Sequence, residues 1–216
     1  MVDKHIGHLL IGLNRLGLKE HANIVVVADH GMVNLSDERV INLDPLIDLS
    51  AFRVPDWSTN KTSVRAPFLN LYTEPMLVDA AFKILHKAHP KMRVLRRGSF
   101  PAEYHFDHPQ REPDLMLLAD SGWSIYASSD KSQPQSMLKL GRTFATHGYD
   151  NQDPLMQATF IASGPAFKKK MTAKPFDNIE VYGLLACALN IKPAKTDGNI
   201  KNVEYLMEKE WLPAVE

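Results

Sequence analysis

Asn23-Ile24-Val25-Val26-Val27-Ala28-Asp29-His30-Gly31-Met32 is the stretch that decides the fold. Residues 24–28 are five consecutive apolar residues, four of them β-branched, and an acid, an imidazole and a glycine follow them. Such a run is typical of a strand that is buried on both faces of a parallel sheet. The sequence therefore predicts a central α/β strand that ends directly in polar side chains.

Asp29 and His30 are candidate metal ligands because of their position at the end of this strand. Adjacent side chains of a strand point to opposite faces, but a turn at Gly31, with positive φ, can present both together. Open α/β sheets bind ligands at the carboxyl ends of their strands, and carboxylate and imidazole both suit zinc. The alternative interpretation is a structural Asp-His-Gly turn, since short motifs often arise by chance.

Composition narrows the class of protein. The chain has 216 residues, 44% of them hydrophobic and 23% charged, which is typical of one globular domain or part of a larger one. Lys+Arg and Asp+Glu balance at 25 each, so there is no nucleic-acid-binding or anionic-lipid signature. No apolar run reaches the roughly 18 residues of a membrane span. The single Cys187 excludes an internal disulfide.

The rest of the chain alternates between helical and strand patterns, as in α/β proteins. Helices are predicted over residues 2–16, with Gly17 as the C-cap, and over residues 75–88, 180–189 and 203–209. Strands are predicted at residues 68–72, 92–95, 114–119, 124–126 and 158–163. Residues 33–66 carry turn formers and little periodicity, which predicts a long loop or an inserted cap. Arg111 and Asp114 are expected to form an ion pair.

A second histidine motif lies far along the chain, at Thr146-His147-Gly148-Tyr149-Asp150-Asn151. It follows a Ser/Gln-rich stretch at residues 128–136, which predicts a loop. Loops held by a rigid scaffold often carry ligand-binding residues. Taken alone, the motif indicates a loop histidine and no particular chemistry.

Together these stretches resemble the nucleotide pyrophosphatase/phosphodiesterase (type I phosphodiesterase) family of the alkaline phosphatase superfamily. The resemblance covers nearly the whole chain, and the order and spacing of several motifs make it specific. It is carried by residues 25–32, 146–151 and 160–167, by Val2-Asp3 with Ile6-Gly7 in the first helix, and by Tyr104-His105-Phe106, Pro113-Asp114 and Gly122-Trp123 between the two histidine motifs.

The resemblance implies an alkaline-phosphatase-like layered α/β/α sheet that carries two divalent metal ions, usually zinc (Zn2+). In the family a Thr or Ser attacks the phosphorus of a phosphodiester or pyrophosphate and forms a covalent phosphoryl-enzyme intermediate. Asp29 and His30 match ligands of the metal that activates this nucleophile. His147 matches a ligand of the second metal, which activates water. The resemblance thus implies that Asp29, His30 and His147 converge at the carboxyl edge of one sheet.

This chain departs from the family in one respect. The family's nucleophile, one metal-binding Asp and an Asp-x-x-x-His ligand pair all lie upstream of the first helix here. We therefore expect residues 1–216 to be the C-terminal portion of a phosphodiesterase-like catalytic domain, incomplete on its N-terminal side, with residues 33–66 and 98–145 as loop or cap insertions. We therefore expect no catalytic residue in this chain, because the nucleophile is expected upstream of Met1.

The resemblance also implies a small-molecule phosphodiester or nucleotide as substrate, and an extracellular or periplasmic location. Two other functions stay open at this stage. One is a phosphatase or phosphonate hydrolase of the same superfamily, and the other is an inactive remnant that acts as a binding module. Because an incomplete sheet exposes an edge and an apolar face, we also expect self-association through the exposed sheet.

Overall fold

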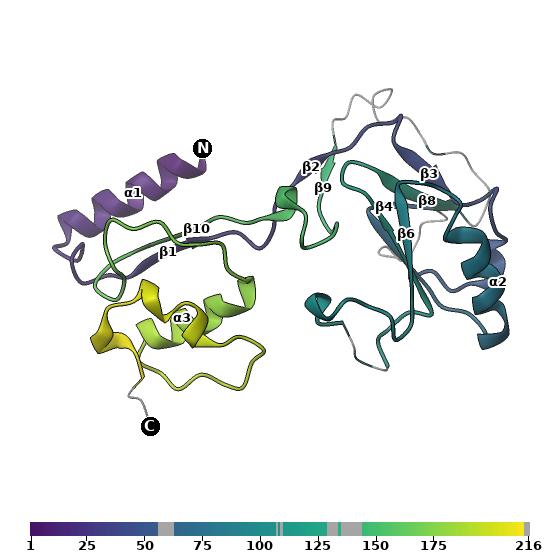
Figure 1. The fold of residues 1–216 in the computed structure, drawn as a ribbon. Helices are drawn as coiled ribbons and strands as arrows, with labels where there is room; N and C mark the ends of the chain where they lie inside the picture. Colours follow the sequence, from purple (N-terminus) through teal and green to yellow (C-terminus); the bar gives the residue numbers. More distant parts are fainter. Residues whose placement is uncertain (56–62, 107, 109, 129–133, 135–143, 214–216) are drawn as a thin grey trace. The chain divides into compact units, whose positions relative to one another are not determined.

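The computed structural model describes residues 1–55, 63–106, 108, 110–128, 134 and 144–213, and they form a mixed α/β fold (Figure 1). The chain divides into two compact units. The first unit holds residues 1–29 and 158–216, and the second holds residues 30–157. Among the described residues, no helix combines the length and apolar composition that crossing a membrane would need.

The predicted central strand forms, as β1 (Ile24–Val27) in the first unit. It pairs antiparallel with β10 (Phe160–Ser163), and in the described part of the chain β10 is its only strand partner. Burial on both faces, which the apolar composition of the strand indicates, is not present in this chain: no residue of β1 is fully buried and Val27 is 48% exposed, as the expected exposed face of an incomplete sheet requires. One face of this pair does pack, through Val25, on the core of the first unit.

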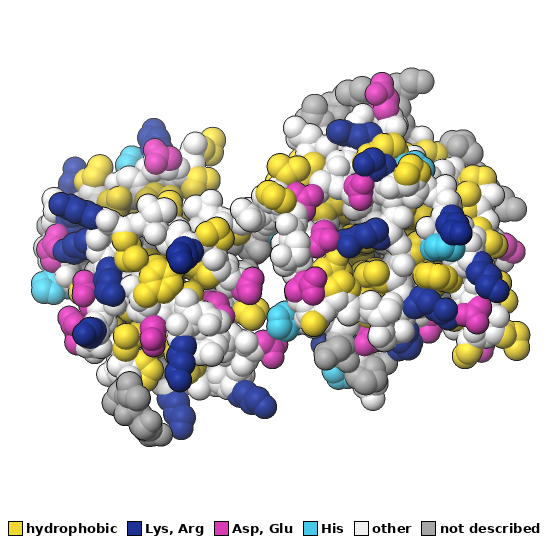
Figure 2. All heavy atoms as spheres, in the orientation of Figure 1, with side chains coloured by type: hydrophobic (Ala, Val, Ile, Leu, Met, Phe, Trp, Pro, Cys, Tyr) yellow, Lys and Arg dark blue, Asp and Glu magenta, His cyan; other side chains and the backbone are white. Residues whose placement is uncertain are grey.

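The first predicted helix is confirmed as α1 (Val2–Arg15), and Gly17, just beyond its end, turns the chain as expected. Gly17 has a φ of 70°, and the N–H groups of Gly17 and Leu18 bond back to carbonyls of the last turn at 3.1 and 2.9 Å. The apolar side of α1 is largely uncovered. No residue of the helix is buried, and Leu9 and Leu16 are 53% and 73% exposed. Figure 2 shows hydrophobic side chains among the charged ones on this unit.

The first unit also contains the predicted helix α3 (Val181–Ala188), preceded by the 3-10 turn η4 (Asn178–Glu180). The helix predicted over residues 203–209 is wrong. The chain there forms 3-10 turns, namely η5 (Ile200–Asn202), η6 (Glu204–Leu206) and η7 (Lys209–Trp211). Apolar residues three apart fit a 3-10 turn as well as a helix, which explains the error.

The described residues of the second unit form three small sheets and one α-helix. Their order is β2–β9, β3–β8–β4 and β5–β7–β6. The core strands are β7 (Leu115–Ala119) and β8 (Ser124–Ser128), both buried at every residue. Around them lie β2 (Val33–Asn34), β3 (Val40–Asn42), β4 (Ser63–Ala66), β5 (Phe68–Leu71), β6 (Met92–Arg96), β9 (Ala145–Thr146), α2 (Pro75–Leu85) and the 3-10 turns η1 (Leu49–Ala51), η2 (Ala102–Tyr104) and η3 (Pro154–Met156).

The structure bears on two expectations for the second unit. Strands β2, β3 and β4 lie within residues 33–66, and the interpretation of this stretch as an inserted cap stays a prediction. The expected pair of Arg111 with Asp114 is wrong: Asp114 pairs with Arg97, at 3.1 Å. The antiparallel ladder between β6 and β7 brings Arg97 beside Asp114. The predicted Ser/Gln-rich loop at residues 128–136 lies mostly outside the described residues.

The two histidine motifs are brought together by the β2–β9 pair, in which Val33 lies opposite Thr146. Gly31 then approaches η3, where its N–H donates to the carbonyl of Met156 at 2.9 Å. A Cβ on Gly31 would lie 2.0 Å from the carbonyl oxygen of Leu155. The positive φ expected at Gly31 is not found. Gly31 is needed because a side chain would not fit.

Gly31→Ala should therefore destabilise the second unit. Overpacking against fixed backbone costs about 1–3 kcal/mol, and here the obstructing atom belongs to the main chain. Urea unfolding of the two proteins measures the change. Gly7→Ala is the matched control, because Gly7 lies in α1 with nothing within 4 Å of an added Cβ and should gain up to about 1 kcal/mol. A Gly31→Ala protein as stable as the parent would contradict the close approach.

Exposed apolar surface on α1 predicts self-association of the chain. We expect a species larger than a single chain in size-exclusion chromatography with light scattering, together with binding of a hydrophobic dye. Leu9→Lys should weaken both. Asn14→Lys adds the same charge to the same helix without removing an apolar side chain, and it should change neither. A monomeric parent chain that binds no dye would contradict this expectation.

Candidate functional site

The candidate site is a pair of stacked imidazole rings in the second unit. His30 lies just before β2, and His147 follows the last residue of β9. Their ring centroids are 3.6 Å apart and their planes differ by 13°. The expectation that these two distant histidines meet is confirmed. They meet beside the short β2–β9 pair, and not at the edge of one large sheet.

The hydrogen bonding of His30 indicates which of its ring nitrogens can act as a ligand. Its Nδ1 lies 2.8 Å from the carbonyl oxygen of Gly31. A carbonyl only accepts hydrogen bonds, so Nδ1 carries the hydrogen and donates it. In the neutral ring the lone pair is then on Nε2. Histidines that bind metals usually have this arrangement, with the second nitrogen held by a backbone carbonyl or a carboxylate.

The stacking of the two rings bears on how they can bind metal ions. The lone pair of an imidazole lies in the plane of the ring, and one ion cannot lie in the planes of two nearly parallel rings whose centroids are 3.6 Å apart. Such a pair suits two neighbouring ions better than one shared ion. Two-metal sites hold their ions about 3.5–4 Å apart, close to the separation of the two rings.

Asp29, the third expected ligand, is exposed and is the last residue of the first unit. The structure brings His30 and His147 together, and metal binding by Asp29 stays a prediction. In the described part of the chain, no group of three or more His, Cys, Asp or Glu side chains is arranged to hold a metal ion. These side chains are therefore of the types that bind zinc, but they do not complete a coordination sphere of about four ligands.

The nucleophile expected upstream of Met1 stays a prediction. Met1 itself is the N-cap residue of α1 in the first unit, where its side chain makes no capping hydrogen bond, and it is 99% exposed. Its thioether is not a nucleophile of the Thr or Ser kind that the family uses. Met1 is therefore not one of the candidate site residues.

The segment after His147 is anchored tightly to the second unit. Gly148 has a φ of 96°, and a Cβ there would lie 3.2 Å from the ring of Phe68. Next, Tyr149 is buried, and its hydroxyl donates to the carbonyl of Trp123 at 2.7 Å. Burial raises the pKa of the Tyr149 hydroxyl. The glycine with positive φ beside the two histidines is therefore Gly148, which follows His147, and not Gly31.

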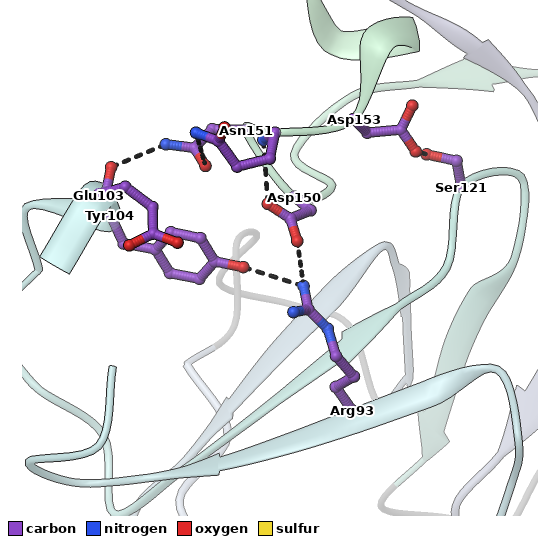
Figure 3. Close-up of polar contacts among 8 residues, drawn as sticks. Arg93, Glu103, Tyr104, Ser121, Asp150, Asn151 and Asp153 are labelled. Atoms are coloured by element: carbon purple, nitrogen blue, oxygen red, sulfur yellow. Dashed lines mark hydrogen bonds and ion pairs between the residues drawn. The ribbon is translucent and has the colours of Figure 1, made fainter. Parts of the chain in front are cut away.

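Asp150 is the charged centre of this segment (Figure 3). Its carboxylate accepts hydrogen bonds from the guanidinium of Arg93 and from the backbone N–H of Gln152, and the same Arg93 nitrogen donates to the hydroxyl of Tyr104 at 2.9 Å. Partial burial raises the pKa of the Asp150 carboxyl, but Gln152 and Arg93 outweigh it and hold that pKa below its usual value. Asp150 is therefore ionised at neutral pH.

Two further contacts fix the same segment (Figure 3). The side-chain amide of Asn151 donates to the carbonyl of Glu103 at 2.8 Å, and the carboxylate of Asp153 accepts from the hydroxyl of Ser121. Asp153 also accepts from the N–H of Leu155 at 2.8 Å and so caps η3.

Sequence reasoning missed the partners of this segment. Arg93 and Tyr104 stand in β6 and η2, far from Asp150 in sequence, and no motif links them. Asp150 and Asn151 themselves follow closely after His147. Their place in that motif was the only sequence feature that could have pointed to a role at the site.

A protein-family model matches most of the chain. The model of "Type I phosphodiesterase / nucleotide pyrophosphatase" matches residues 1–150, a range that contains Asp29, His30 and His147. Among curated relatives, bis(5'-adenosyl)-triphosphatase ENPP4 of Bos taurus is 32% identical over 97% of this chain and 42% of its own length. An uncharacterized pyrophosphatase/phosphodiesterase of Schizosaccharomyces pombe is 33% identical over 98% of this chain and 44% of its own.

Solved structures of this family also match the chain. Human ectonucleotide pyrophosphatase/phosphodiesterase 5 matches with a TM-score of 0.80 and 27% identity, over 96% of this chain and 51% of that one. An inactive murine form of the same protein, in complex with AMP, matches with a TM-score of 0.79 and 30% identity. The chain thus spans about half the length of the relatives it matches. It belongs to the type I phosphodiesterase/nucleotide pyrophosphatase family of the alkaline phosphatase superfamily.

Proposed function

We propose that this chain contributes part of a two-metal centre that hydrolyses phosphodiester or pyrophosphate bonds in nucleotides. The observation that carries the proposal is the stacked pair of His30 and His147, with Nδ1 of His30 held by the carbonyl of Gly31. Membership of the family supports the reaction class. The AMP in the murine structure and the bovine relative, a bis(5'-adenosyl)-triphosphatase, support a nucleotide as substrate.

In this proposal Asp29 and His30 hold one zinc ion and His147 holds the other. When bound, the ions neutralise the negative charge that develops on the phosphoryl oxygens and activate the nucleophile and water. This chain's own contribution is to place the imidazoles. The β2–β9 pair sets their separation, and the carbonyl of Gly31 fixes the tautomer of His30.

The remaining ligands and the nucleophilic Thr or Ser lie, in this proposal, upstream of Met1 and so outside the 216 residues. The relatives are about twice as long as the stretch that this chain matches, which leaves room for such residues. Three donors from this chain are too few for two ions that each prefer about four. A covalent phosphoryl-enzyme intermediate also requires a nucleophile, and none is assigned here.

His147→Ala should abolish most hydrolysis in a full-length protein that contains this chain. Loss of residues that merely support a ligand costs 10–100-fold, so the loss of a ligand itself should cost roughly 100-fold or more. The initial rate with a chromogenic phosphodiester in excess zinc measures the effect. His5→Ala is the matched control, because His5 lies in α1 and should leave the rate unchanged. Equal rates in the His147→Ala variant and the parent would refute the assignment.

The 216-residue chain by itself should not hydrolyse the same substrate above background, because the nucleophile is expected outside it. Its purified form is assayed with and without added zinc, beside a relative of full length as the positive control. Zinc-dependent turnover by the isolated chain would show that the nucleophile lies within these residues and that the assignment above is wrong.

A further inference from the structure

One short segment, residues 147–156, is linked to both histidines. His147 is its first residue. At its other end the carbonyl of Met156 accepts the N–H of Gly31 at 2.9 Å, and the carbonyl of Gly31 in turn accepts from His30. A shift of this segment would therefore move one ring directly and the other through Gly31. The separation of the two rings depends on where the segment lies.

We propose that Asp150 is a positioning residue for the histidine pair and that it acts through Arg93 and Tyr104. Asp150 lies near the middle of the segment and is the residue that ties it by charge to β6. The consequence for metal binding rests on the function proposed above, whereas the positioning of the rings does not.

The geometry around Asp150 fits this role. One carboxylate oxygen accepts the N–H of Gln152 at 3.0 Å and so fixes the local turn, while the other accepts from Arg93. Arg93 stands in β6, opposite Leu118 of the fully buried strand β7. The guanidinium is held from a second side by Tyr104 of η2. Asp150 thus joins the loop that carries His147 to the sheet that contains the buried core.

Stability alone does not explain this contact. The side chains of Arg93 and Asp150 are 47% and 29% exposed, and exposed ion pairs contribute little to the free energy of unfolding. The same strand carries a similar pair, Arg96 with Asp79 of α2, with exposed fractions of 44% and 70%. That second pair lies outside residues 147–156, so it offers a matched control of the same chemistry.

The test compares Asp150→Asn with Asp79→Asn in the full 216-residue chain, without metal. Histidine-labelled protein is studied by NMR, and the cross-ring NOE between His30 and His147 reports the stacking. Asp150→Asn should weaken or abolish this NOE and shift the ring signals of both histidines, because the side-chain amide no longer attracts the guanidinium. Asp79→Asn should leave the NOE and the shifts unchanged. Urea unfolding confirms that both variants are folded.

Arg93→Lys serves as a second variant if Asp150→Asn fails to fold. It keeps the charge but replaces the guanidinium, one nitrogen of which donates to both Asp150 and Tyr104, with the ammonium of a shorter side chain, so the NOE should be weakened. An unchanged NOE in a folded Asp150→Asn or Arg93→Lys protein would overturn the proposal, and so would the absence of the NOE in the parent chain. Zinc titration of a full-length protein that contains this chain separates the two ideas: histidine signals that do not respond to zinc there would refute the metal role and leave the positioning role standing.

Discussion

The close approach of Gly31 to η3 is the contact on which the rest of the site depends. The hydrogen bond from Gly31 N–H to the carbonyl of Met156 forms only because no side chain separates the two backbones. It fixes the carbonyl of Gly31, which holds His30 in one tautomer. Met156 ends the segment of residues 147–156, and His147 is the first residue of that segment. One backbone contact therefore sets the identity of the ligand nitrogen and the place of its ring.

Local patterns predicted most of the elements. The apolar spacing of α1 and the run of residues 24–27 placed the helix and the strand correctly, since both patterns are decided by neighbours in sequence. Strands β2 and β3 were missed because two or three residues are too few to show a period. The antiparallel pairing of β1 with β10 was not predicted, because pairing depends on residues far away in the chain.

For the site, the sequence predicted the two histidines but not the reasons for their position. His30 and His147 were recognisable because each belongs to a motif. The role of Gly31 was not, since the obstructing carbonyl belongs to Leu155, far later in the chain. The Arg93–Asp150 pair was equally invisible, because a charged residue in a strand has many candidate partners and only the tertiary structure selects one.

The central claim is that the two stacked histidines bind two different ions. A crystal structure of a full-length protein containing this chain, grown with zinc and measured at the zinc absorption edge, tests it most directly. The account predicts two anomalous peaks about 3.5–4 Å apart, one about 2.0–2.1 Å from a nitrogen of His30 and the other at that distance from a nitrogen of His147. A single peak shared by both rings, or no peak within ligand distance of either ring, would contradict it.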